Sequence, residues 1–277
     1  MSAEPRPQTV TPPAERPGRR PALLEVEDVT LRFFGVTALK DVSFSVPEGE
    51  LFAIIGPNGA GKTSIFNCLS GYYRPQKGAI RLAGESLVGR RRDSARLGVG
   101  RTFQNLGLFT NLSVVDNIML GRHLKMRTGF LAGALWLGRA RREEIEHREA
   151  VEEIIDFLEL EAVRHQPVGL LPYGVQKRVE LGRALAMEPR LLLLDEPVAG
   201  MNLEETEDMA RYIVEIREQL GLTILLVEHD MALVMDLADR VLALDFGEVI
   251  AEGTPAEVQA NERVIAAYLG TGEEGEA

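Results

Sequence analysis

The chain has 277 residues, of which 45% are hydrophobic and 26% charged, and its formal net charge is −11 at pH 7. A chain of this length and composition buries a substantial core, as one domain with a subdomain or as two small domains. Its acidic balance argues against a broad nucleic-acid surface. The single cysteine, Cys68, cannot form an internal disulfide and fits a reducing, cytoplasmic setting. No apolar run approaches the roughly 20 residues that a membrane-spanning helix needs.

The first part of the chain shows the alternation of apolar and polar residues that is typical of β-strands. Residues 1–21 are rich in proline and arginine without the apolar segment of a signal peptide, so we expect a disordered lead. Short antiparallel strands are then predicted from alternating apolar residues. These residues are Leu24 and Val26, then Leu31 and Phe33, then Val42, Phe44 and Val46, with further strands around Ile80 and Leu82 and over 99–103.

A glycine-rich loop at 56–63 follows the apolar run 51–55, which is typical of a buried strand, and precedes apolar residues at helical spacing. In this order the glycines turn N–H groups inward and the helix N-terminus attracts anions, so the loop is expected to cradle phosphate. Lys62 would reach the β- and γ-phosphates, and the Thr63 hydroxyl would bind Mg²⁺. The alternative is a plain glycine turn before a core helix. The expected nucleotide contacts are Gly56, Pro57, Asn58, Gly59, Ala60, Gly61, Lys62, Thr63 and Ser64.

The middle of the chain changes to helical patterns, and strands return later. Helices are predicted over 112–120 and along the apolar stripe Val151, Ile154, Ile155 and Leu158, and the mixed-charge run 139–149 indicates a solvated helical face. Helix and strand then alternate, which predicts a doubly wound, largely parallel α/β sheet. The expected elements are helix 179–187, strand 191–194, helix 204–220, strand 223–227 and a hairpin that turns at Phe246 and Gly247.

Two carboxylates follow the all-apolar run 191–194, at the end of a strand where ligands bind in such sheets. Asp195 suits the role of a Mg²⁺ ligand. Glu196 would face the γ-phosphate, where a carboxylate can orient and deprotonate an attacking water. The alternative is an acidic turn at a strand end, closed by Pro197.

Two further polar side chains follow strands. His229 comes after the run 223–227 and could donate a hydrogen bond to a γ-phosphate oxygen, although a histidine after a strand is often structural. The amide of Gln104 could contact Mg²⁺ or the water. Gln104 would thereby report the nucleotide state to the helical segment that follows.

The order and spacing of these pieces, from about residue 24 to 269, resembles the ATP-binding subunit of ABC transporters. The resemblance implies a P-loop NTPase fold of the ABC-ATPase type, with a mostly parallel core sheet, an antiparallel β-subdomain and a helical insert. It places the ABC domain at residues 22–269, the helical subdomain at about 105–178 and a disordered acidic tail at 270–277. ATP and Mg²⁺ are the implied cofactors, and Phe33 matches the aromatic residue that stacks on adenine.

The signature sequence of that family departs from its usual form Leu-Ser-Gly-Gly-Gln. Here residues 171–175 read Leu-Pro-Tyr-Gly-Val, and Pro172 offers neither a hydroxyl nor an N–H group. Tyr173 and Gly174, with the N-terminus of a helix that begins near Val175, remain suited to an anion. In the family this segment binds the γ-phosphate held by a partner subunit.

Within the family, the chain is similar to the LivG-type ATPases of branched-chain amino acid importers. The sequences Arg-Thr-Phe-Gln-Asn at 101–105 and Glu-His-Asp-Met at 228–231 carry this similarity, which extends equally to importers of amides, urea or aromatic acids. The implied partners are a second ABC ATPase subunit, homomeric or heteromeric, transmembrane permease subunits and, indirectly, an extracytoplasmic solute-binding protein, with no nucleic acid. The implied location is the cytoplasmic face of the plasma (inner) membrane, as a peripheral subunit.

Phe130, Leu131 and Trp136 in the helical insert are candidates for the groove that receives a permease helix, or they form the core of the insert. A soluble ABC ATPase acting on ribosomes or in DNA repair is the competing function. Such proteins usually carry two cassettes or a long coiled-coil insert. An unrelated P-loop kinase is disfavoured because no acceptor-substrate module is left.

Overall fold

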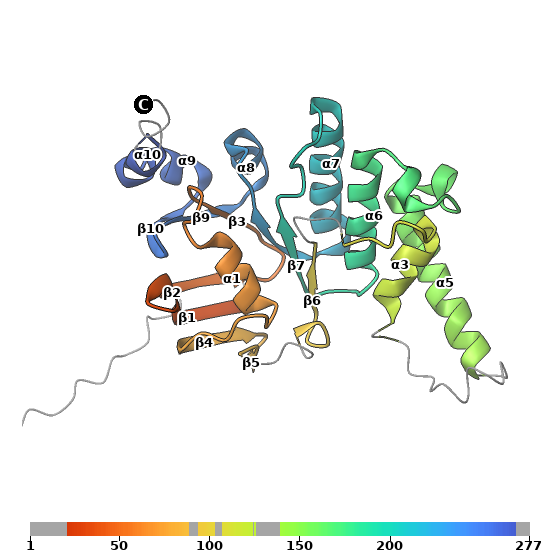
Figure 1. Ribbon diagram of the computed structural model, residues 1–277, viewed down its shortest axis with the longest axis horizontal. Coiled ribbons are helices and arrows are strands. Elements are labelled where there is room, and N and C mark those ends of the chain that lie inside the picture. The colour runs from red at the N-terminus through yellow and green to blue at the C-terminus, as the bar shows by residue number, and fades with distance from the viewer. Residues whose placement is uncertain (1–20, 89–93, 103–106, 124, 126–138, 270–277) are drawn as a thin grey trace, which may run out of the picture.

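The computed structural model describes residues 21–88, 94–102, 107–123, 125 and 139–269, whose strands form two sheets (Figure 1). The larger sheet has the order β10-β9-β3-β8-β7-β6, and the smaller has the order β2-β1-β4-β5. The strands are β1 (Ala22–Phe33), β2 (Val36–Pro47), β3 (Leu51–Ile55), β4 (Lys77–Leu82), β5 (Glu85–Ser86), β6 (Val99–Arg101), β7 (Leu191–Asp195), β8 (Thr223–Val227), β9 (Arg240–Asp245) and β10 (Glu248–Gly253). The α-helices are α1 (Lys62–Leu69), α3 (Val114–Arg122), α5 (Arg139–Phe157), α6 (Tyr173–Leu185), α7 (Leu203–Leu220), α8 (Met231–Leu237), α9 (Pro255–Gln259) and α10 (Glu262–Leu269), with short 3₁₀ helices at Glu161–Val163 and Val168–Leu170.

The larger sheet is parallel from β9 to β6, and only β10 runs antiparallel, as the partner of β9 in a hairpin. This confirms the predicted doubly wound sheet and the predicted hairpin. Every residue of β3, β7 and β8 is buried. These strands are continuous apolar runs because helices or the second sheet cover both of their faces.

Alternate side chains of the same strand enter two different cores. Leu192 and Leu194 of β7 join the core formed with the helices α3, α5, α6 and α7. Leu191 and Leu193 join the core formed with α1 and the smaller sheet. Because successive side chains of a β-strand point to opposite faces, the same central strands pack against the helical part on one face and against the antiparallel part on the other.

The antiparallel part differs from the sequence prediction in one respect. The apolar pairs at 24–26 and 31–33, expected on separate short strands, lie on the single strand β1. The register of β1 against β2 shifts between Val26 and Val29, where Asp28 has a left-handed φ of 47°. Such an irregularity changes the phase of the alternation, and this makes one strand look like two in the sequence.

The helical part also corrects two expectations. The mixed-charge run 139–149 lies on α5, and most side chains of 142–149 are exposed, but His147 is buried and its Nδ1 accepts a hydrogen bond of 3.1 Å from Nε of Arg122. Helix α6 begins at Tyr173, two residues before the start expected near Val175 and earlier than the predicted run 179–187, with Pro172 at its N-cap. Among the described helices, none combines the length and the apolar character required to cross a membrane.

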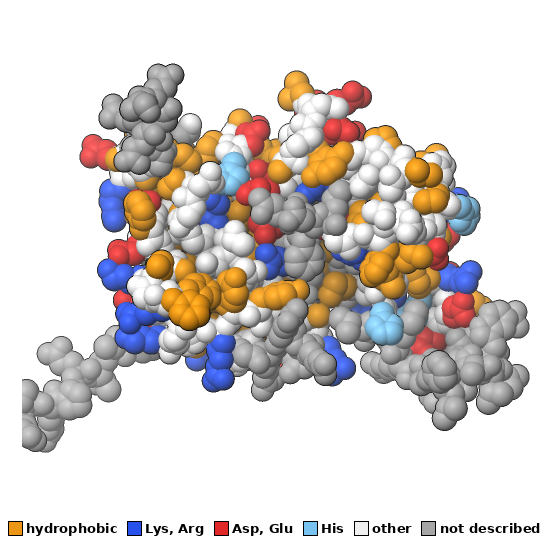
Figure 2. Space-filling view, in the orientation of Figure 1, with side chains coloured by type: hydrophobic (Ala, Val, Ile, Leu, Met, Phe, Trp, Pro, Cys, Tyr) orange, Lys and Arg blue, Asp and Glu red, His pale blue; other side chains and the backbone are white. Residues whose placement is uncertain are grey.

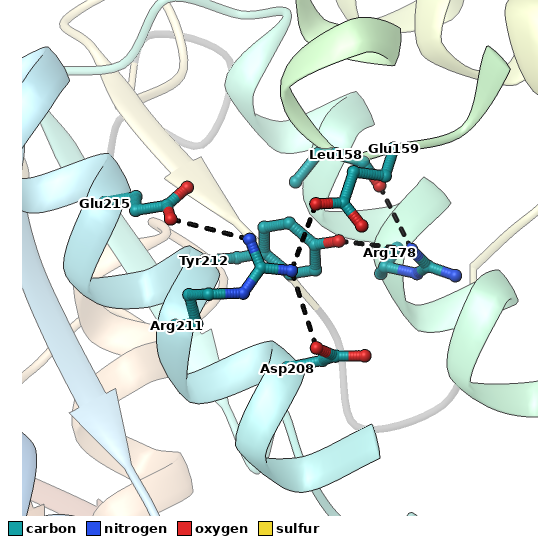
Figure 3. Close-up of polar contacts among 7 residues, drawn as sticks. All are labelled: Leu158, Glu159, Arg178, Asp208, Arg211, Tyr212 and Glu215. Atoms are coloured by element: carbon teal, nitrogen blue, oxygen red, sulfur yellow. Dashed lines mark hydrogen bonds and ion pairs between the residues drawn. The ribbon is translucent and has the colours of Figure 1, made fainter. Parts of the chain in front are cut away.

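A buried tyrosine joins three segments of the helical part (Figure 3). Tyr212 of α7 is 0% exposed, and its hydroxyl accepts a hydrogen bond of 3.2 Å from Arg178 of α6, which also donates to the carbonyl of Leu158 at 3.2 Å. The guanidinium of Arg211 lies 4.4 Å from the centre of the tyrosine ring and forms an ion pair of 3.2 Å with Glu159. This cluster fixes the end of α5 against α6 and α7.

We expect Tyr212→Phe to lower the free energy of unfolding by about 1–2 kcal/mol, since it keeps the ring but deprives Arg178 of a buried acceptor. Chemical denaturation of both proteins measures the difference. The matched control is Tyr73→Phe at a side chain that is 36% exposed, for which a change below about 0.5 kcal/mol is expected. Equal stability of Tyr212→Phe and the parent would show that the hydroxyl does not hold the helices together.

Candidate nucleotide site

The phosphate loop lies between β3 and α1, and its glycines have backbone conformations that other residues rarely adopt. Gly56 has a φ of 151°, and a Cβ at this position would lie 2.3 Å from the carbonyl oxygen of Leu244 in β9. Gly61 has a φ of 106° and occupies the N-cap of α1. The loop therefore lies against β9 and presents the first-turn N–H groups of α1, which have no acceptor within the helix.

Lys62 is held inside this loop. Its ammonium donates hydrogen bonds of 2.5 Å and 3.1 Å to the carbonyls of Gly56 and Pro57, and the residue is 6% exposed. Burial lowers the pKa of Lys62, and the nearby charges of Glu196 and Asp195 oppose this shift. The loop lysine and the two strand-end carboxylates, far apart in sequence, thus belong to one electrostatic site.

Asp195 ends β7 and is buried. One of its oxygens, Oδ2, accepts a hydrogen bond of 2.8 Å from Nη2 of Arg101, and its backbone N–H donates to the hydroxyl of Thr102 at 3.3 Å. Glu196 follows with a left-handed φ of 49° and donates its N–H to Val227 at 2.9 Å. The left-handed backbone and this hydrogen bond fix the position of Glu196 directly after the end of β7.

Glu196 and His229, two predicted catalytic residues, are in direct contact. Nε2 of His229 lies 2.7 Å from Oε1 of Glu196. Glu228, the residue before the histidine, is 3% exposed and its carboxylate accepts hydrogen bonds from the N–H groups of Val198 at 3.1 Å and His229 at 2.9 Å. Burial raises the pKa of Glu228, while these backbone donors oppose the shift. The carboxylate of Glu228 thus joins the segment after Glu196 to the segment that carries His229.

The donors at the site fit a polyphosphate with a hard cation. The loop offers N–H groups and an ammonium to an anion, whereas the Thr63 hydroxyl on the exposed first turn of α1 and the Asp195 carboxylate are oxygen ligands suited to Mg²⁺. Across the described ranges, no group of three or more acidic, histidine or cysteine side chains could hold a metal on its own.

Other predicted site residues lie elsewhere. Tyr173 and Gly174 begin α6, which Figure 1 shows apart from α1, and they contact the segment that leads into α7. Phe33 ends β1 with 37% of its surface exposed, and its ring meets that of Tyr73 edge-on at 4.9 Å. Gln104, Phe130, Leu131 and Trp136 fall outside the described residues.

Sequence reasoning missed three residues that hold the site together. Arg101 pairs with Asp195, Glu228 links two loops, and Lys177 of α6 donates to the carbonyl of Glu196 at 3.5 Å. A signal existed for Glu228, which follows the apolar strand β8 as Glu196 follows β7. Arg101 and Lys177 gave no comparable signal, because a basic residue in a short strand or a helix is usually solvated.

Comparisons with known proteins place the chain in a family. Residues 39–199 match the family model of the ABC transporter, and residues 248–274 match that of the branched-chain amino acid ATP-binding cassette transporter. The chain is 42% identical to the high-affinity branched-chain amino acid transport ATP-binding protein BraF of Pseudomonas aeruginosa, over 90% of this chain and 98% of that protein. The chain belongs to the ABC transporter family. Its ABC cassette is an ATPase, and the predicted resemblance and fold class are confirmed.

Other relatives agree with this assignment. The cassette is 40% identical to the protein LivG of Salmonella typhimurium, which bears the same description as BraF, again over 90% of this chain and 98% of that protein. The solved structure of an ABC transporter cassette in its ADP conformation superposes with a TM-score of 0.78 at 28% identity, over 90% of this chain and 99% of the other. These similarities span the larger sheet, the smaller sheet and the helical part together.

The carboxyl-terminal segment that carries the second family match lies beside the phosphate loop. A pocket of about 240 Å³ separates them, lined by Pro57, Asn58, Gly59 and Ala60 of the loop, Asp245 and Phe246 of the β9–β10 turn, and Ala266 and Ala267 of α10. The N–H of Gly247 in this turn donates to the carbonyl of Ala60 at 3.0 Å. The β9–β10 hairpin thus supports the loop from the side opposite to Asp195.

We expect Gly56→Ala to weaken ATP binding at least tenfold, since the new Cβ must displace either the loop or the Leu244 backbone. The matched control is Gly35→Ala, which has a φ of 100° but open space around its Cβ position. That control should cost about 1–3 kcal/mol of strain without changing the affinity of the folded protein for ATP. Titration with a fluorescent ATP analogue measures both, and unchanged affinity in Gly56→Ala would contradict the close fit of the loop.

Proposed function

We propose that this ABC ATPase powers an importer of branched-chain amino acids or related small polar solutes, with Glu196 as its catalytic base. The contact of Glu196 with His229 beside the buried Lys62 carries the catalytic part of the proposal. The match of residues 248–274 to the branched-chain amino acid cassette and the names of the relatives support the solute class.

Binding begins at the phosphate loop. Lys62 would exchange its carbonyl partners for the β- and γ-phosphates, while the first-turn N–H groups of α1 bind the remaining phosphate oxygens. The aromatic ring of Phe33 offers an exposed face for adenine. Thr63 and Asp195 would hold Mg²⁺, which neutralises charge on the phosphates when bound. Gln104 is proposed as a further ligand from sequence alone.

Hydrolysis needs a water aligned with the γ-phosphate and a group that accepts its proton. The Glu196 carboxylate is proposed to take this proton. His229, whose Nε2 lies 2.7 Å from Oε1 of Glu196, positions the carboxylate in the absence of nucleotide and would turn its N–H to a phosphate oxygen once ATP is bound. The left-handed backbone conformation of Glu196, and the hydrogen bond from Lys177 to its carbonyl, fix the backbone position from which the carboxylate side chain extends. The protein positions and neutralises groups in this scheme and forms no covalent intermediate.

A second ATPase subunit is proposed to complete each site. Helix α6, which begins at Tyr173, lies apart from α1 of the same chain (Figure 1), and we propose that its start binds a phosphate held by another copy or by a sister subunit. ATP would then be bound between two subunits. If the closed dimer binds ATP more tightly than the open one, ATP shifts the equilibrium toward the closed dimer. This difference in affinity can drive a conformational change in a permease.

The helical part is the proposed contact with the permease. Figure 2 shows hydrophobic side chains on the surface over α3, and Phe109, Leu112, Leu120 and Leu170 of this part are all exposed. An exposed apolar group of this kind marks a protein contact. Through it the cassette would associate with the cytoplasmic face of the membrane, and a solute-binding protein would act only on the permease.

Reconstitution tests the transport function. The cassette purified with its cognate permease should support ATP-dependent uptake of radiolabelled leucine into vesicles, and Glu196→Gln should abolish this uptake. Uptake of an amide, urea or an aromatic acid in place of leucine would revise the solute class. Co-sedimentation with ribosomes and none with a permease would favour the competing soluble function.

We expect Glu196→Gln to form a stable dimer in Mg-ATP, because ATP remains uncleaved between the subunits. Light scattering measures the mass. Lys62→Met in the same background is the control and should remain monomeric, since it loses the phosphate contact. A Glu196→Gln protein that stays monomeric with Mg-ATP, both alone and with each sister subunit, would contradict the proposed sandwich.

The proline in the signature segment leads to a second prediction. Pro172 is the N-cap of α6 and makes no side-chain cap hydrogen bond. In Pro172→Ser the hydroxyl could cap the helix, worth about 1 kcal/mol, and donate to a phosphate in the partner. We therefore expect a higher steady-state ATPase rate at saturating ATP. A rate that is unchanged or lower would show that Pro172 does not slow this site.

A further inference from the structure

We propose that Arg101 is a positioning residue of the ATP site, which holds the Asp195 carboxylate in place for Mg²⁺ and ties it to the helix of the phosphate loop. The inference rests on the proposed role of Asp195 as a Mg²⁺ ligand. Arg101 itself would contact neither the nucleotide nor the metal. It acts through Asp195.

The guanidinium of Arg101 joins two parts of the site. Its Nη2 donates to Oδ2 of Asp195 at 2.8 Å, and its Nη1 donates to Oδ1 of Asn67 at 2.8 Å and to the hydroxyl of Ser70 at 3.1 Å. Asn67 belongs to α1 and Ser70 caps its end, and the same helix begins with Lys62. One planar group therefore sets the distance between the acidic end of β7 and the helix that follows the phosphate loop.

The surroundings make this connection rigid. The side chains of Arg101 and Asp195 are 8% and 5% exposed, and the guanidinium carbon lies 5.5 Å from the centre of the Phe66 ring, also on α1. A buried carboxylate without a partner is costly. The fork of an arginine fixes the orientation of such a carboxylate, whereas the point charge of a lysine fixes it less well.

The backbone beside Arg101 holds Asp195 as well. The Thr102 hydroxyl accepts a hydrogen bond from the N–H of Asp195, and the N–H of Thr102 donates to the carbonyl of Leu193 at 3.0 Å. Arg101 and Thr102, at the end of β6, therefore hold the end of β7 through the Arg101–Asp195 ion pair and the hydrogen bonds of Thr102 with Leu193 and Asp195. In sequence, this end of β6 leads directly to Gln104. A displacement of β6 would therefore shift the Asp195 carboxylate, the proposed ligand of Mg²⁺.

The test compares nucleotide affinity with and without Mg²⁺. A fluorescent ATP analogue is titrated into the parent, Arg101→Met and Arg101→Lys, once in MgCl₂ and once in EDTA. In Arg101→Met we expect at least a tenfold loss of affinity in MgCl₂ and less than a twofold loss in EDTA, with Arg101→Lys between parent and Arg101→Met. Arg81→Met removes an arginine whose ion pair with Glu27 is exposed and should match the parent in both buffers.

Two results would overturn the inference. An equal loss in both buffers would make Arg101 part of the phosphate loop or of the fold, and no loss in either would remove its role. A parent protein that fails to bind the analogue, or binds it equally in MgCl₂ and EDTA, would instead contradict the proposed ATP and Mg²⁺ site itself.

A double variant keeps the test valid if Arg101→Met does not fold. Arg101→Met with Asp195→Asn removes both buried charges, so no carboxylate is left unpaired. Because Arg101 acts through Asp195, this variant should show the same ratio of affinities in MgCl₂ and EDTA as Asp195→Asn alone. A further tenfold change in that ratio would mean that Arg101 acts on another group, and the inference would be wrong.

Discussion

The site depends on one constraint, that parallel strands buried on both faces end at a common edge. Strands β3, β7 and β8 lie side by side and in register, so the residues that follow them meet although they are far apart in sequence. The phosphate loop, the Asp195–Glu196 pair and the Glu228–His229 pair each follow one of these strands. Both cores depend on the same strands, so a change in their register would disturb packing and site together.

The carboxylates at this edge are held by groups that lie outside strands β3, β7 and β8. Arg101 of β6 pairs with Asp195, Lys177 of α6 contacts the backbone of Glu196, and backbone N–H groups satisfy Glu228. Each contact comes from a different element. The carboxylates are therefore held by the relative positions of β6, α6 and the loop after Glu196, and a movement of any of these elements alters the site.

Most strands of the larger sheet, the phosphate loop and the strand-end carboxylates could be predicted from the sequence, because each shows locally as an apolar run with polar or glycine residues at its end. Prediction failed where the decisive contact is distant. The burial of His147, for example, depends on a hydrogen bond from Arg122 on another helix. The alternation in β1 was misread because the irregularity near Asp28 changes its phase. The role of Arg101 depends on β6 lying beside β7, and this strand order is not encoded by propensity or periodicity.

Opposite pKa shifts at the site have the same origin. Burial lowers the pKa of Lys62 and raises that of Glu228, so both charged forms are disfavoured by loss of water. A polyphosphate beside Lys62 would stabilise its ammonium, and a divalent cation would stabilise the nearby carboxylates. The ligand therefore supplies the opposite charges that the buried charged groups of the protein lack. Its binding should stabilise the fold by about 2.7 kcal/mol at a ligand concentration of a hundred times its Kd. A site that is costly alone and favourable when filled couples nucleotide binding to the arrangement of β6, α1 and α6, which is what an ATP-driven switch requires.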